Sequence, residues 1–115
     1  MGIIKFVSDK LFANGKEVMT EDTTLGVNQT WVDETANRTF DVEYTNDTGK
    51  PIMVILRLID AKNNGSSFYV DGLRILSIYV SGGGNTDTCI VPAGAIYKLG
   101  LEGSGGSVDM WLELK

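Results

Sequence analysis

Short apolar segments with strand-like alternation recur along this chain, and glycine, asparagine or aspartate separates most of them from the next. Such segments, spaced about eight to twelve residues apart, are typical of a β-sandwich or barrel, whereas an amphipathic helix repeats its apolar residues about every 3.6 residues. Helical periodicity is scarce here. The pattern therefore predicts an all-β chain, namely an antiparallel, jelly-roll-like β-sandwich with an N-terminal β-hairpin.

The 115 residues are enough for one domain and too few for a second core. Residues 1–24 predict a hairpin with a connector, used for docking or oligomerisation, in which Asn14-Gly15 forms a type I′ turn. Residues 25–115 predict the sandwich, and residues 61–67 predict a loop within it. A second primed turn is expected at Asp71-Gly72. The strands of the sandwich are expected at residues 31–32, 40–45, 51–59, 68–71, 73–80, 86–91, 95–101 and 107–114.

Alternation along these strands predicts which side chains face the core. Trp111 is expected to point outward, because Met110 and Leu112 on either side of it are assigned inward. The side chains expected to be buried are Trp31, Phe40, Val42, Tyr44, Val54, Leu56, Val70, Val91, Met110 and Leu112.

Residues 51–59 are apolar on both faces, which a two-layer domain does not require. We expect Met53 and Ile55, together with Trp111, to form a surface that a second subunit covers. The chain is therefore predicted to be a homo-oligomer. Alternatively, the N-terminal hairpin folds back over this strand and covers it with Ile3, Ile4 and Phe6.

The composition limits the chemistry. The chain has no histidine and one cysteine, Cys89, so Ser-His-Asp and Cys-His triads and histidine zinc sites are excluded. Carboxylate pairs could still act in a glycosidase, but we expect the candidates to lie exposed at turns or on polar strand faces. We predict no enzyme activity, no cofactor and no metal. The candidate carboxylates are Asp33, Glu34, Asp41, Glu43, Asp71, Asp109 and Glu113.

The net charge of −5, with no cluster of lysine or arginine, argues against a nucleic-acid partner. The N-terminus shows no secretion signal, and the longest apolar run, residues 51–56, is too short for a membrane helix, so we expect no membrane insertion. The glycine-rich segments 82–84 and 103–106 lack the context of a phosphate-binding loop and predict flexible connections. Candidate ligand-binding loop residues are Asn64, Gly83, Asn85 and Gly105.

Five segments in the same order resemble the C-terminal domain of tail-fibre proteins from tailed bacteriophages and prophages: residues 25–33, 44–52, 68–72, 90–97 and 111–115. The resemblance implies a β-sandwich in a virion appendage, commonly a homotrimer, that contacts the host surface. Its partners would be other virion proteins and a bacterial surface glycan.

Two features qualify the resemblance. The match begins at Leu25, so we expect no long fibre shaft before it, and the family offers no set of catalytic residues to carry over. The predicted function is a non-enzymatic virion structural protein, made in the host cytoplasm and located in the virion, that serves as a receptor-binding module. The alternative is a capsid decoration or tail accessory protein with a purely structural role.

Overall fold

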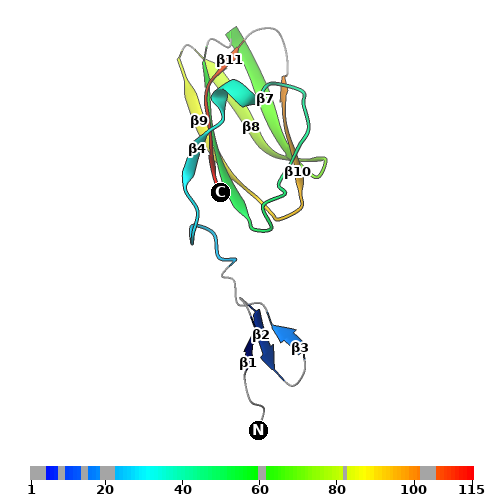
Figure 1. The fold of residues 1–115 in the computed structure, drawn as a ribbon. Coiled ribbons are helices and arrows are strands. Elements are labelled where there is room, and N and C mark those ends of the chain that lie inside the picture. The colour runs from blue at the N-terminus through cyan, green and yellow to red at the C-terminus, as the bar shows by residue number, and fades with distance from the viewer. Residues whose placement is uncertain are drawn as a thin grey trace.

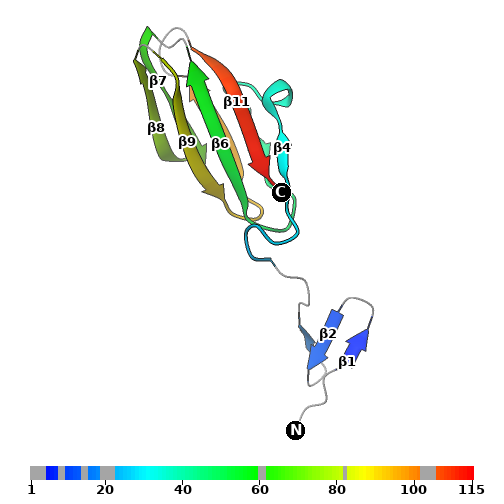
Figure 2. The same ribbon diagram turned by 90° about the vertical axis from the view of Figure 1, so that its left-hand side faces the viewer.

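The computed structural model describes residues 5–7, 10–13, 16–18, 23–59, 62–81, 83–101 and 106–115. Within these ranges the chain forms strands and one short 3-10 helix, η1 (Thr35–Asn37), and no α-helix. Two four-stranded antiparallel sheets pack face to face (Figures 1 and 2). The predicted all-β sandwich is therefore confirmed.

Each sheet of the sandwich contains four strands. One sheet has the order β4 (Trp31–Asp33), β11 (Ser107–Leu114), β6 (Ile52–Ile59) and β9 (Asn85–Val91). The other has the order β5 (Tyr44–Thr45), β10 (Ile96–Leu101), β7 (Lys62–Val70) and β8 (Leu73–Ser81).

The strand order is that of a jelly roll. The chain pairs as one long antiparallel hairpin, in which β4 pairs with β11, β5 with β10, β6 with β9 and β7 with β8. Rolling this hairpin brings β6 beside β11 and β7 beside β10, which completes the two sheets. Each sheet therefore contains strands from both halves of the sequence, and segments far apart in the chain become neighbours.

Three short antiparallel strands precede the sandwich: β1 (Lys5–Val7), β2 (Lys10–Ala13) and β3 (Lys16–Val18). In both views this small sheet lies apart from the sandwich and not over β6 (Figures 1 and 2). The expected turn at Asn14-Gly15 falls outside the described residues, as do Ile3 and Ile4.

The core lies between the two sheets, and β6 contributes its regularly alternating inner face. Ile52, Val54, Leu56 and Leu58 are buried, while the residues between them are half-buried. The predictions for Val54, Leu56, Val70 and Val91 are confirmed. The other buried apolar residues are Phe68, Ile78, Cys89, Ala95, Tyr97, Leu99 and Trp111.

Two predicted core residues are exposed. Trp31 is 49% exposed and Val42 is 41% exposed. Asp41 has a φ of 60°, which interrupts the expected strand, so that regular pairing begins only at Tyr44. Phe40 and Tyr44 are half-buried and pack against the core.

A β-bulge in β11 reverses the predicted orientation of its second half. Val108 pairs with Leu58 and Met110 pairs with Arg57, so Asp109 between them has no residue opposite. An extra residue shifts the alternation of side chains by one position. Trp111 is consequently fully buried, contrary to the prediction, whereas Met110 and Leu112 face outward and are half-buried.

The first half of β7 corrects another prediction. Residues 62–67, expected in a loop, belong to the strand, and Gly65 explains how they pair closely with β8. A Cβ atom at Gly65 would lie 2.9 Å from the backbone oxygen of Ile78. The predicted primed turn is confirmed, since Asp71 and Gly72 have φ values of 50° and 80°.

Candidate functional site

A buried carboxylate, that of Glu113 on β11, lies at the centre of the most elaborate polar cluster among the described residues. Its Oε2 accepts hydrogen bonds from Arg38 Nε at 3.1 Å, from the Tyr97 hydroxyl at 2.9 Å and from Trp111 Nε1 at 2.9 Å. Its Oε1 accepts from Arg38 Nη2 at 3.2 Å and from Lys115 Nζ at 3.1 Å. The side chain has no exposed surface.

Glu34 joins the same cluster through the two cations. Its Oε2 lies 2.7 Å from Arg38 Nη2 and 2.8 Å from Lys115 Nζ, and Asn37 donates to its Oε1 at 3.0 Å. The expectation that Glu34 and Glu113 are exposed was wrong. Each looks like a surface residue in the sequence, because its cationic partners become visible only when the strands are assembled.

The electrostatics of the cluster keep both carboxyls ionised. Burial raises the pKa of Glu113, but the hydrogen bonds from Arg38, Lys115, Tyr97 and Trp111 outweigh it and leave that pKa below its ordinary value. Bonds from Lys115 and Asn37 lower the pKa of Glu34. A general acid needs a raised pKa and free access to substrate. This arrangement therefore suits a structural role, in which the cluster holds segments of the chain together, better than proton transfer.

The polar cluster around Glu113 joins segments that are distant in sequence. The rings of Tyr44 and Phe68 contact the Trp111 ring at centroid distances of 5.9 and 6.2 Å, and the Arg38 guanidinium lies 4.5 Å above the Tyr44 ring centroid. Trp111 N also donates to Thr35 Oγ1 at 3.0 Å, which fixes η1 on β11. Within the described part of the chain, every buried side-chain nitrogen or oxygen has a hydrogen-bond partner.

The other predicted carboxylates do not converge. Asp33 accepts from Thr35, Asp41 from the amide of Leu101, and Asp71 from the amide of Ile96. Asp109 forms an exposed ion pair with Arg57 at 3.2 Å. In the described ranges, no group of three or more His, Cys, Asp or Glu side chains could hold a metal ion. Cys89 is a buried free thiol, and burial raises its pKa.

The β4-β11-β6-β9 sheet carries an apolar outer face. Strand register places Trp31, Leu114, Met53 and Ile90 side by side in one row across all four strands. Leu112 and Ile55 are opposite each other in the next row. We call this surface the apolar outer face, and its residues are Trp31, Met53, Ile55, Ile90, Met110, Leu112 and Leu114.

Sequence reasoning identified only part of this face. Met53 and Ile55 lie on it as predicted, but Trp111 does not, and the exposed tryptophan is Trp31 instead. The outward orientation of Trp31 was missed because β4 has only three residues, too few for the alternation to show which side chains face the core. Its register with Leu114, which the fold alone provides, puts it on the outer face.

The predicted ligand-loop residues are only partly in loops. Asn64 belongs to β7, so its predicted place in a loop was wrong, and Gly105 lies outside the described residues. Gly83 is exposed between β8 and β9. Asn85 begins β9, and its side-chain amide donates to the backbone oxygen of Tyr79 at 3.0 Å.

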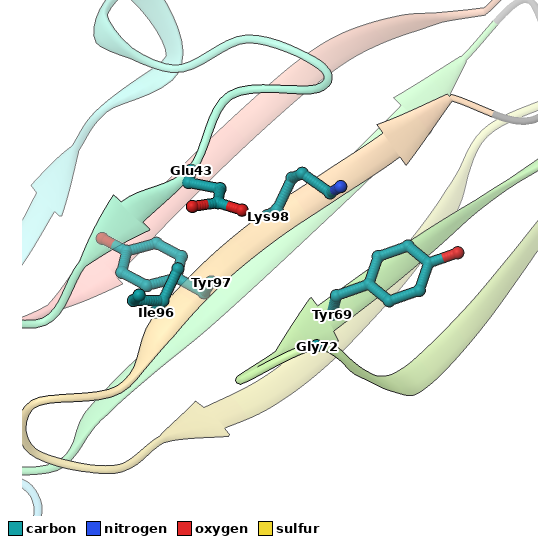
Figure 3. Close-up of a pocket in the computed structure, with 6 residues that line it drawn as sticks. All are labelled: Glu43, Tyr69, Gly72, Ile96, Tyr97 and Lys98. Carbon is teal, nitrogen blue, oxygen red and sulfur yellow. The ribbon is translucent and has the colours of Figure 1, made fainter.

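A pocket of about 280 Å³, which sequence reasoning did not predict, lies on the β5-β10-β7-β8 sheet (Figure 3). It is lined by Glu43, Tyr69, Gly72, Ile96, Tyr97 and Lys98.

No family model, curated protein or solved structure matches this chain. Among the described residues, no helix is long and apolar enough to cross a membrane.

Proposed function

We propose that this chain is a non-enzymatic structural subunit of a bacteriophage virion that works by associating with further copies of itself. The observation that carries the association is the apolar outer face. Trp31 and Ile90, at the two edges of its first row, are 49% and 53% exposed. Large contiguous apolar patches on soluble proteins usually mark sites of protein contact.

The size of the face fits a subunit interface. The four strands have 3, 8, 8 and 7 residues, and at about 3.3 Å per residue and about 4.8 Å between strands they span roughly 400 Å² in projection. The accessible area of a corrugated sheet exceeds its projection, so this side of the sheet supplies more than about half of the 800 Å² per partner of a standard interface.

The charge distribution favours further copies of the chain as the occupants. Asp33 is the only charged residue in the two rows that hold most of the apolar side chains, and Arg57 and Asp109 beside them neutralise each other. Identical faces of this kind can meet around a symmetry axis with little repulsion, despite the net charge of −5 on each chain.

The virion assignment rests on the sequence resemblance to tail-fibre C-terminal domains. That resemblance favours three copies and a role in contact with the host surface, with β1–β3 used for docking to the particle. The capsid decoration or tail accessory role remains the alternative, because the apolar outer face serves either one.

Multi-angle light scattering at micromolar concentration tests the association. We expect the wild-type mass to be a multiple of 12.5 kDa, with three copies favoured. Ile90→Lys should give a monomer, and because this side chain is half in solvent, the variant should still fold. Ser77→Lys, at an exposed position of β8 on the other sheet, is the matched control and should keep the wild-type mass.

A wild-type mass of 12.5 kDa would overturn the association, as would an unchanged mass for Ile90→Lys. The virion role is tested by quantifying the chain in purified particles. Its presence in isolated tails supports the tail-fibre role, its presence in isolated capsids supports decoration, and its absence from particles contradicts both.

A further inference from the structure

The pocket lies on the outer face of the β5-β10-β7-β8 sheet, away from the apolar outer face. Tyr69 borders it from β7, Ile96 and Lys98 from β10, and Glu43 from the segment before β5 (Figure 3). Tyr97, which also lines it, belongs to the buried core. The pocket is therefore a surface depression with a few convergent side chains around it.

Gly100 allows the ring of Tyr69, which lines the pocket, to lie close to the sheet. Tyr69 Cε2 would lie only 3.0 Å from a Cβ atom at Gly100. Because Gly100 has no side chain, the Tyr69 ring can lie close to the backbone of β10. The half-exposed ring thus presents a flat aromatic surface beside the pocket.

The polar groups at the pocket have opposite charges. Lys98 Nζ lies over the face of the Tyr69 ring, 5.3 Å from its centroid, and the Glu43 carboxylate lies across the opening from Tyr69 (Figure 3). An anionic ligand would meet Glu43 and a cationic ligand would meet Lys98. The pair suits a neutral ligand that can both accept and donate hydrogen bonds.

A sugar ring combines the required properties. One face of a pyranose presents C–H groups that pack on an aromatic ring, and its hydroxyls radiate around the edge as donors and acceptors. The volume of about 280 Å³ falls just below the range for drug-sized ligands and suits one ring. The exposed Ile96 side chain adds an apolar contact.

We propose that this pocket binds one neutral pyranose unit of a glycan. The sugar displaces the flexible Lys98 side chain from the face of Tyr69, packs on that ring, and bonds through its hydroxyls to Glu43 and Lys98. The proposal gives the host-contact part of the proposed function a ligand site. It does not depend on self-association, because the pocket and the apolar outer face belong to different sheets.

The experiment is a titration of the ¹⁵N-labelled protein with glucose, galactose, mannose, rhamnose and N-acetylglucosamine, followed by amide chemical shifts. At least one of these sugars should give saturable shifts at Gly72 and Ile96. Tyr69→Ala should weaken that binding about tenfold or more, while Tyr69→Phe keeps it. Tyr79→Ala is the matched control, since Tyr79 is 57% exposed and does not line the pocket.

Charged sugars test the assignment of Glu43 without altering the core. N-acetylneuraminic acid and glucosamine should bind more weakly than the best neutral sugar, and Glu43→Gln should improve binding of the acidic one. The absence of saturable shifts with every neutral sugar would overturn the proposal, as would binding that Tyr69→Ala leaves unchanged. Ile90→Lys should bind the sugar as the wild type does, which separates this site from the association.

Discussion

The indole Nε1 of Trp111 donates a 2.9 Å hydrogen bond to the carboxylate of Glu113, two residues further along the same strand. Both side chains point into the core because the bulge at Asp109 has shifted the alternation of β11. The domain therefore buries a charged group beside its largest aromatic ring. This arrangement makes the stability of the sandwich depend on one carboxylate.

Removing that carboxylate should be severely destabilising. Glu113→Leu leaves Arg38 Nε, the Tyr97 hydroxyl and the Trp111 indole without their acceptor, so the free energy of unfolding should fall by about 3–5 kcal/mol. Urea denaturation followed by tryptophan fluorescence measures it. Asp109→Ala, which breaks only the exposed pair with Arg57, should cost less than about 1 kcal/mol. Similar losses in the two variants would contradict the buried cluster.

Stability should also fall in acid. The pKa values of Glu34 and Glu113 are lowered from the ordinary 4.5, so their stabilisation is complete above that pH. Below it the unfolded chain takes up protons before the folded chain does, and the free energy of unfolding declines until the folded carboxyls titrate. Denaturation between about pH 7 and pH 3 measures this decline. Glu113→Gln should show a shallower decline, and an equal slope would exclude Glu113 as its source.

The close approach of β7 and β8 predicts an intolerant glycine. In Gly65→Ala the new Cβ would lie 2.9 Å from the backbone oxygen of Ile78, so the strands must separate, at a cost of about 1–3 kcal/mol. Gly83→Ala is the matched control, since no atom lies within 4 Å of its Cβ position. Thermal unfolding of both variants checks the prediction. A neutral Gly65→Ala would mean that the strands lie further apart than described.

Truncating a buried side chain of β6 should destabilise the domain. Leu56 has no exposed surface, and Leu56→Ala should lower the free energy of unfolding by about 2–5 kcal/mol through lost burial and a cavity. Leu73 is 68% exposed on the other sheet, so Leu73→Ala should change it by no more than about 0.5 kcal/mol. Chemical denaturation compares the two variants, and an equal effect would show that the inner face is misassigned.

Local patterns in the sequence were sufficient for the fold class and for the orientation of β6. Residues 52–59 alternate without interruption, so the inward set follows from parity alone. The turn at Asp71-Gly72 was also predictable, because its backbone angles depend on those two residues. The apolar second face of β6 was visible for the same reason, which is why Met53 and Ile55 were found.

Only the tertiary structure decided the orientation of Trp111, the burial of Glu113 and the place of Trp31. A bulge arises from how two strands pair, so alternation within residues 107–114 cannot reveal it. The partner of Glu113 is Arg38, 75 positions away, and a buried charge is tolerated only where such a partner meets it. Parity is a property of one strand, whereas register and ion pairing belong to the assembled sheets.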